Sequence, residues 1–237
     1  MPFDAILFDK DGTLVDFDRT WGPAAHDVMS TLAAGDRGAF ARLVDVSRFD
    51  LEAMTFGVDS PLLAGSSAIY GPLWADALGR LDLPVLCREM DDLFRAAALA
   101  SLAPLGDPHR LACGLRARGL KLGIASNDAE ASVRAQAGRL GIAELMDFVA
   151  GYDSGFGGKP LPGMVTAFAR HCGVAPGRIA MVGDTMHDVD AARAAGAVSI
   201  GVLSGPGHHD ELRAHADHVI DHVELLPALL DRLARIA

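Results

Sequence analysis

The sequence predicts an α/β protein: a Rossmann-like parallel sheet core with an α-helical cap inserted after the first strand. Two observations lead to this fold class. From residue 107 onward, short apolar runs alternate with helix-like segments, a pattern typical of a parallel sheet covered on both faces. One further apolar run, residues 5–8, lies near the start of the chain, and a long helical region separates it from the others. We therefore expect a core domain from residues 1–16 and 104–237 and a cap domain from residues 17–103.

The first strand is expected at Ala5–Phe8, because a short apolar run that ends in charged residues fits a fully buried strand. Alanine, leucine and arginine dominate the cap region, which predicts several short helices and no strand. The glycines and prolines expected to separate these helices are Gly22-Pro23, Gly35, Gly57, Pro61, Gly71-Pro72 and Pro84.

The rest of the core is expected to alternate between helix and strand. The predicted helices are residues 107–118, 129–140, 162–172 and 187–195, and the predicted strands are 121–125, 148–150, 179–182 and 199–202. A strand with polar flanks at 217–221 and a closing helix at 223–236 complete the pattern.

Composition narrows the class of function. The 237 residues carry a net charge of −10, and binding to a phosphate backbone needs a basic surface, so we expect no nucleic-acid partner. The three cysteines are widely spaced and form no C-x-x-C pair, which indicates reduced core thiols: Cys87, Cys113 and Cys172. No signal peptide or membrane-spanning run is evident. We expect a cytoplasmic protein without membrane contact, as a monomer or homodimer.

Four polar clusters follow predicted strands. They are Asp9–Thr13, Ser126–Asp128, Gly157–Pro160 and Gly183–Asp188. Because ligands of open parallel sheets bind outside the carboxyl ends of the strands, these clusters should share one ligand-binding edge.

The first cluster combines carboxylates with a turn. Side chains alternate along an extended chain, so Asp9 and Asp11 should share a face. Lys10 should then reach the opposite side or the rim, without neutralising the pair. Gly12 and Thr13 should form a turn whose N–H groups are free to bind an anion.

The last cluster adds two carboxylates to the same edge. Asp184 and Asp188 are four residues apart at a strand-to-helix junction, so both can face one point. Converging carboxylates repel one another unless a cation lies among them, and hard oxygen ligands favour Mg²⁺. Lys159 and Ser126 could then hold a phosphate on the other side.

These four clusters together resemble the haloacid dehalogenase-like (HAD) hydrolases, especially phosphatases of the phosphoglycolate phosphatase type. The matching segments are DKDGTLVD (residues 9–16), SN (126–127), GGKP (157–160) and GDTMHDVDAARAAG (183–196), in the order that the family has them. The residue between the first two aspartates is usually apolar in the family, so Lys10 is a departure. Since its side chain should leave the site, we expect little effect on the chemistry.

The resemblance implies a role for each site residue. Asp9 would attack phosphorus and become an aspartyl-phosphate, and Asp11 would act as general acid and then as general base. Mg²⁺ would be bound by Asp9, Asp184 and the backbone carbonyl of Asp11. Asp188 would support a metal-bound water or orient Lys159. The phosphate-binding residues would be Ser126, Asn127 and Lys159.

More than one reaction fits this resemblance. The first is Mg²⁺-dependent hydrolysis of a small phosphorylated metabolite, with 2-phosphoglycolate as the candidate substrate. The alternative is a sugar-phosphate mutase of the β-phosphoglucomutase type, which shares the pair Asp9 and Asp11. A binding module with a vestigial site is a third possibility. The presence of Asp11 argues against a dehalogenase, and the absence of lysine from residues 17–103 argues against Schiff-base chemistry.

Some of these residues also have simpler, non-catalytic explanations. Asp9 and Asp11 could be a solvated strand end, Ser126-Asn127 is also good turn and capping chemistry, and Asp188 suits a helix dipole.

Other candidates remain open from the sequence. Histidines spaced closely in the sequence are a candidate zinc site, but their rings should not share a face. We therefore expect them to be solvent-exposed side chains at the rim of the protein. They are His208, His209, His215, His218 and His222. Trp21 and Arg19 could enter the pocket from the cap entrance, or Trp21 could instead pack the first cap helix. The cap arginines that could bind a substrate carboxylate are Arg19, Arg42, Arg48, Arg80 and Arg88.

Overall fold

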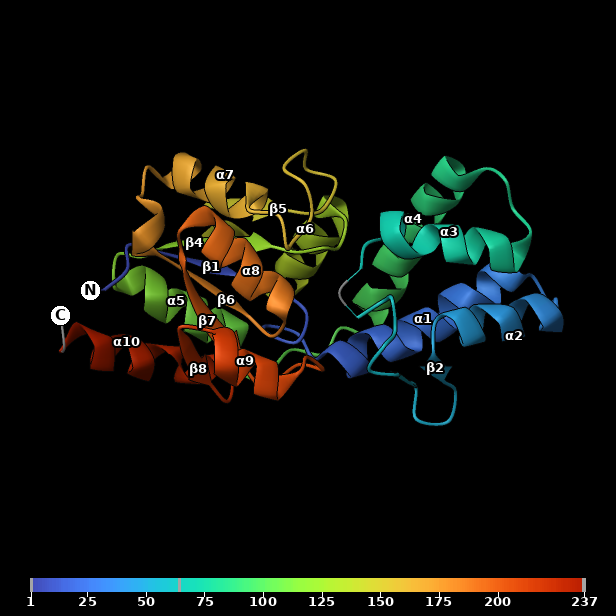
Figure 1. The fold of residues 1–237 in the computed structure, drawn as a ribbon, viewed down its shortest axis with the longest axis horizontal. Coiled ribbons are helices and arrows are strands. Elements are labelled where there is room, and N and C mark those ends of the chain that lie inside the picture. Colours follow the sequence, from blue (N-terminus) through green and yellow to red (C-terminus); the bar gives the residue numbers. More distant parts are fainter. Residues whose placement is uncertain (1, 64, 236–237) are drawn as a thin grey trace. The chain divides into compact units, whose positions relative to one another are not determined.

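The structure is a computed structural model, and it describes residues 2–63 and 65–235. The chain divides into two compact units (Figure 1). One unit, here called the core, runs to Asp16 and resumes at Pro104. The other, here called the cap, is Phe17–Ala103.

The core contains a six-stranded sheet in which every pair of neighbouring strands is parallel, which confirms the predicted fold class. Its order is β5-β4-β1-β6-β7-β8. The strands are β1 (Ala5–Phe8), β4 (Lys121–Ala125), β5 (Phe148–Ala150), β6 (Ile179–Gly183), β7 (Val198–Val202) and β8 (His218–Ile220).

The first strand lies in the middle of this sheet, between β4 and β6. Phe8, its last residue, pairs with Ile124 on one side and Val182 on the other. The residues that follow these three strands therefore leave the sheet at the same edge, beside the point where the strand order reverses.

The helices of the core lie close to the predicted ranges, except that the helix at residues 209–215 and two short 3₁₀ helices were not predicted. They are α5 (Pro108–Ala117), α6 (Glu130–Arg139), α7 (Gly163–Cys172), α8 (Met186–Ala195), α9 (His209–His215) and α10 (Leu226–Ala234), with the short 3₁₀ helices η1 (Ala143–Leu145), η2 (Pro176–Arg178) and η3 (Val223–Leu225). The predicted closing helix is thus η3 followed by α10, and its last predicted residue, 236, lies outside the described residues.

One face of the sheet packs against α7 and α8. Ala5 and Leu7 point to this side, as the alternation of a strand requires, and join a buried cluster that includes Phe168 of α7. Phe168 is fully buried, and burying such a side chain contributes about 1.5–3 kcal/mol to the free energy of unfolding. This packing fixes β1, and with it the residues that follow β1.

The cap is mainly helical. Its helices are α1 (Phe17–Ala33), α2 (Arg37–Val46), α3 (Ser67–Leu78) and α4 (Leu83–Ala100). The prediction of no strand here was wrong, because β2 (Phe49–Asp50) and β3 (Thr55–Phe56) form a small antiparallel pair.

Two of the expected helix breakers lie inside helices. Pro23 is within α1 and Pro72 within α3, so the predicted separations at Gly22-Pro23 and Gly71-Pro72 were wrong. The glycines have packing roles instead. A Cβ at Gly22 would lie 1.9 Å from the Met54 carbonyl oxygen, and one at Gly71 would lie 2.8 Å from Cys87 Sγ. Both glycines allow neighbouring segments to approach the helix closely.

The aromatic residues of the cap pack with one another. Trp74 is fully buried, and its indole N–H donates a hydrogen bond to Ser47 Oγ at 2.9 Å. The ring of Trp21 lies 5.7 Å from that of Phe94, measured between centroids. Of the two readings of Trp21, packing of the first cap helix is therefore the one that the structure shows.

The three cysteines are free thiols, but the prediction that all lie in the core was wrong. Cys113 is exposed, and Cys87 and Cys172 are half-buried. Among the described helices, none is long and apolar enough to cross a membrane.

Candidate active site

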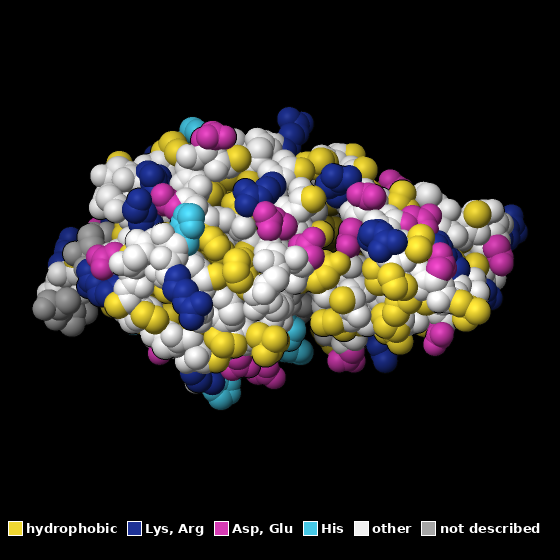
Figure 2. All heavy atoms as spheres, turned by 90° about the horizontal axis from the view of Figure 1, so that it is seen from above, with side chains coloured by type: hydrophobic (Ala, Val, Ile, Leu, Met, Phe, Trp, Pro, Cys, Tyr) yellow, Lys and Arg dark blue, Asp and Glu magenta, His cyan; other side chains and the backbone are white. Residues whose placement is uncertain are grey.

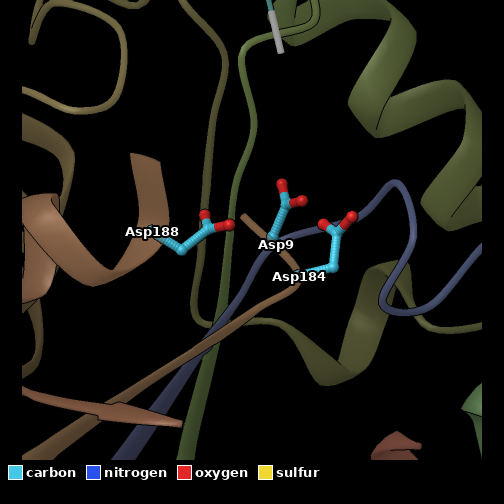
Figure 3. Close-up of side chains that lie close together, drawn as sticks. All are labelled: Asp9, Asp184 and Asp188. Atoms are coloured by element: carbon cyan, nitrogen blue, oxygen red, sulfur yellow. The ribbon is translucent and has the colours of Figure 1, made fainter. Parts of the chain in front are cut away.

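Three carboxyl groups meet at the carboxyl edge of the sheet. Asp9 directly follows β1, Asp184 directly follows β6, and Asp188 lies in the first turn of α8. One oxygen of each lies within 4.8 Å of the others, and all three residues are buried. Figure 3 shows the three side chains clustered where these elements end. Among the described residues, this is the cluster of acidic, cysteine or histidine side chains that could hold a metal ion.

A buried lysine joins this cluster from another segment. Lys159 lies in the loop after β5, and its Nζ is 2.6 Å from Asp9 Oδ1 and 2.7 Å from Asp188 Oδ1. With all three carboxyl groups ionised, the three carboxylates and the one ammonium would carry a net charge of −2 in a buried place. A divalent cation would balance this charge.

Burial and neighbouring charges shift the pKa values of Asp9, Asp184 and Lys159. Burial raises the pKa of Asp9 to about 7, with Lys159 opposing and Asp188 and Asp11 adding to the rise. Burial, Asp9 and Asp188 also raise the pKa of Asp184 well above its usual value. Burial disfavours the charged form of Lys159, but Asp188 and Asp9 outweigh it, so the pKa of Lys159 is raised. The ammonium therefore stays charged, while Asp9 and Asp184 need a further cation to ionise fully.

Asp184 has the features of a metal ligand. Its Oδ1 atom is buried and has no hydrogen-bond partner, which is costly for a carboxylate oxygen unless an ion binds it. Two glycines make room for the group. A Cβ at Gly12 would lie 2.3 Å from Asp184 Oδ2, and one at Gly205 would lie 1.9 Å from the same atom. The donor set and its uncompensated charge fit a hard divalent cation.

Asp188 is engaged by the protein at both oxygens. Oδ1 accepts from Lys159, and Oδ2 accepts from the backbone N–H of Thr185 at 3.1 Å and from Thr185 Oγ1 at 2.8 Å. The Thr185 contacts cap the start of α8. Of the two roles predicted for Asp188, these contacts favour the orientation of Lys159.

The motif after β4 fixes the position of Lys159. Asn127 Nδ2 donates to the Lys159 carbonyl at 2.9 Å, and the Lys159 backbone N–H donates to Asn127 Oδ1 at 2.8 Å. Ser126 is buried, and its Oγ accepts from the backbone N–H of Asp128 at 3.1 Å. The structure thus brings the predicted phosphate-binding residues together, and the side chain of Asn127 holds the backbone of Lys159 in place.

Asp11 and Lys10 do not lie as predicted. Lys10 is fully buried, and its Nζ is 3.0 Å from both Asp11 Oδ1 and Asp11 Oδ2. The prediction that Lys10 leaves Asp11 for the opposite side or the rim was wrong. The extended chain ends at Phe8, and the N–H groups of Leu14 and Val15 both donate to the Lys10 carbonyl. The chain is therefore already turning at Lys10, and strand alternation no longer applies.

The same turn occupies the N–H groups that were predicted to be free for an anion. The Gly12 N–H donates to the Val15 carbonyl at 2.7 Å, and the Thr13 N–H donates to the Lys10 carbonyl at 3.3 Å. Gly12 adopts a positive φ of 72°, which explains the glycine at this position.

The remaining candidates are the histidines of the core and the arginines of the cap. The described residues include no histidine in a metal-like group with other ligands; His209 Nε2 instead lies 3.2 Å from the Gly205 carbonyl. In the cap, Arg80 pairs with Asp82 and Glu89, and Arg42 Nε donates to the Ala77 carbonyl.

The sequence reading missed two participants in this region. Gln136 of α6 is fully buried and accepts from Lys10 Nζ at 2.9 Å, and nothing in its sequence context indicates this. Gly205 follows β7 at the same edge of the sheet. The rule about carboxyl ends of strands, extended to β7, would have pointed to Gly205.

Comparison with known proteins identifies a matching hydrolase family and related phosphatases. A family model described as haloacid dehalogenase-like hydrolase matches residues 3–196. The N-acetylmuramic acid 6-phosphate phosphatase of Pseudomonas aeruginosa is 26% identical over 234 residues, which cover 98% of this chain and 96% of that protein. The phosphoglycolate phosphatase of Rhodospirillum rubrum is 32% identical over 213 residues, covering 84% and 79%.

A solved structure shares the fold along almost the whole chain. The crystal structure of a predicted phosphoglycolate phosphatase from Haemophilus somnus 129PT has a TM-score of 0.76 and 18% identity, and the alignment covers 97% of this chain and 99% of that one. This likeness concerns the fold alone. The family model and the two relatives, however, extend over most of the sequence. The chain therefore belongs to the haloacid dehalogenase-like hydrolase family and is an enzyme related to phosphoric monoester hydrolases.

Proposed function

We propose that this chain is a Mg²⁺-dependent phosphatase that hydrolyses a small phosphate monoester through an aspartyl-phosphate on Asp9. The observation that carries the proposal is the buried cluster of Asp9, Asp184 and Asp188 around Lys159. The two relatives named as phosphatases support the same reaction class.

The residues present fit a magnesium ion. Asp9 and Asp184 would hold it, because Asp184 Oδ1 has no other partner and the cluster carries uncompensated negative charge. We propose the backbone carbonyl of Asp11 as a further ligand. When bound, Mg²⁺ supplies Lewis-acid stabilisation of the phosphoryl oxygens.

The chain's own side chains would perform two displacements. A carboxylate oxygen of Asp9 forms a bond to phosphorus while the bond from phosphorus to the ester oxygen breaks, and Asp11 gives its proton to the departing alcohol. In the second step, Asp11 takes a proton from water as the water oxygen attacks phosphorus. The Asp9–phosphorus bond then breaks, which restores both carboxyl groups and releases phosphate.

Lys159 would stabilise the charge that moves during both steps. Its ammonium is held by Asp9 and Asp188, and the Asn127 amide hydrogen-bonds both the backbone N–H and the carbonyl of Lys159. A charged donor that is already in place needs little reorganisation in the transition state. Asp188 therefore supports the reaction through Lys159.

The candidate substrates share one chemical feature. Both 2-phosphoglycolate and N-acetylmuramic acid 6-phosphate, taken from the names of the two relatives, are phosphate monoesters that also carry a carboxylate. We propose a small substrate of this kind. On the face drawn in Figure 2, the Lys and Arg side chains of the described residues are interspersed with Asp and Glu, which suits a small ligand better than nucleic acid.

The proposal is tested by release of inorganic phosphate from a panel of monoesters, in Mg²⁺ and in EDTA. The panel contains 2-phosphoglycolate, N-acetylmuramic acid 6-phosphate, sugar phosphates and nucleoside monophosphates. Asp9→Asn keeps the size of the side chain and serves as the blank, so Mg²⁺-dependent release that is absent from this variant supports the proposal.

Other outcomes point to other functions. Equal release of phosphate by Asp9→Asn and by the unaltered protein would refute the assignment of Asp9 as the nucleophile. If no ester releases phosphate, isomerisation of sugar phosphates would favour the mutase. Binding of phosphate without any turnover would favour a vestigial site.

A further inference from the structure

A second lysine is buried beside the active-site carboxylates. Lys10 Nζ contacts both oxygens of Asp11 at 3.0 Å, Asp128 Oδ2 at 3.1 Å and Gln136 Oε1 at 2.9 Å. Only about 1% of its side chain is exposed, against 17% for that of Asp11. Lys10 is thus completely enclosed, while the carboxyl group that it holds remains partly open.

The ammonium of Lys10 is itself held in place. Gln136 Nε2 donates to Ser132 Oγ at 3.1 Å, which fixes the amide so that its Oε1 faces Lys10. Asp128 accepts from Lys10 through Oδ2 and from the Ala129 N–H through Oδ1 at 2.8 Å. Residues of α6 and of the loop before it therefore anchor the lysine that reaches Asp11.

These anchors give Asp11 a defined orientation. A carboxyl group on a turn rotates about two side-chain bonds, and contact of one ammonium with both oxygens restricts that rotation. Proton transfer needs the acid within hydrogen-bond reach of the departing oxygen, and a misplacement of about 1 Å can lower a rate by about 100-fold. We propose that Lys10 is a positioning residue that holds the Asp11 carboxyl group for proton transfer to the leaving alcohol.

This inference rests on the proposed function, in which Asp11 is the general acid. It differs from a purely structural role, in which Lys10 only neutralises the buried side chains of Asp11 and Asp128. A structural defect would lower activity on every ester alike. A defect in proton delivery would lower activity mainly on esters whose leaving group needs the proton.

The test compares two leaving groups. An alkyl phosphate, the best substrate from the panel above, releases an alkoxide that must be protonated. p-Nitrophenyl phosphate releases a stabilised phenolate that does not need the proton. The measured quantity is kcat/KM, because it reports the steps up to departure of the leaving group and excludes hydrolysis of the intermediate.

The expected result for Lys10→Met is a fall in kcat/KM of about 100-fold on the alkyl ester and of less than about threefold on p-nitrophenyl phosphate. Asp11→Asn is the reference variant and should show the same split, to a larger extent. Lys121→Met is the matched control, because Lys121 is half exposed at the start of β4, outside the site, and should leave both values unchanged.

Equal losses on both esters in a folded Lys10→Met protein would overturn the inference while leaving the phosphatase proposal intact. If Asp11→Asn also shows no split, the acid role of Asp11 fails, and the inference fails with it. Should Lys10→Met not fold, Gln136→Met decides, since it removes one acceptor of Lys10. A split of about tenfold between the esters supports the inference, and no split overturns it.

Discussion

The replacement Gly205→Ala should disable the proposed metal site without removing any of its proposed ligands. Gly205 follows β7, and a Cβ added to it would lie 1.9 Å from Asp184 Oδ2, 2.4 Å from Cγ and 2.7 Å from Cβ of the same residue. Since the whole Asp184 side chain is in the way, rotation of its carboxyl group alone cannot relieve the overlap.

The size of the effect follows from these distances. Ordinary van der Waals contact begins at 3.4 Å, so the carboxylate or the loop must move by about 1.5 Å. Asp184 Oδ1 then no longer lies where a cation shared with Asp9 can reach it. A displacement of this size should lower kcat/KM by about 100-fold and raise the Mg²⁺ concentration needed for half-maximal rate.

The assay is phosphate release as a function of Mg²⁺ concentration, with circular dichroism to show that the fold is kept. Gly114→Ala is the matched control, because a Cβ at Gly114 of α5 meets nothing within 4 Å and alanine favours a helix. Unaltered activity and Mg²⁺ requirement in Gly205→Ala would refute the assignment of Asp184 as a metal ligand.

Two further predictions concern the metal and the pH dependence of stability. EDTA should abolish phosphate release and excess Mg²⁺ should restore it, because the Asp9, Asp184 and Asp188 cluster lacks a counter-charge beyond Lys159; activity that survives EDTA would exclude a metal from the mechanism. Burial raises the pKa of Asp217, but hydrogen bonds from the Ser199 backbone N–H and Oγ outweigh it, so the pKa is lowered. The ionised group therefore stabilises the fold above its unfolded pKa, near 4, and this contribution is lost as the pH falls through the folded pKa. Asp217→Ala should lower the free energy of unfolding at pH 7 by about 1 kcal/mol, a small value because solvent screens this exposed group, and the difference should shrink below about pH 4. Urea denaturation at both pH values measures it, and an identical difference at both would contradict the linkage.

The order of the elements was predictable because the core follows simple periodic rules. The strands at residues 121–125 and 148–150 have the predicted bounds, since a strand buried on both faces is a short apolar run between turns. Once the strands are placed, the sheet rule brings Asp9, Ser126 and Asp184 to one edge. The family motifs then name the residue types that meet there.

The direction of single side chains was not predictable in the same way. The sequence shows Lys10 between two aspartates, and the alternation of side chains along an extended chain predicted that Lys10 points away from both. The structure turns the chain after Phe8 and places Lys10 against Asp11, Asp128 and Gln136. Gln136 lies 126 positions away along the chain, so no local pattern could have joined the two.

Sequence by itself therefore determined the fold class, the order of the strands along the chain and the chemical types gathered at their carboxyl ends. These follow from local periodicity and from motifs of a few residues. Tertiary structure alone decided which carboxylate each lysine holds, which oxygen of Asp184 stays without a partner, and that Gly205, Gly22 and Gly71 allow close packing. Such features depend on distances between segments remote in sequence, and those distances exist only once the chain has folded.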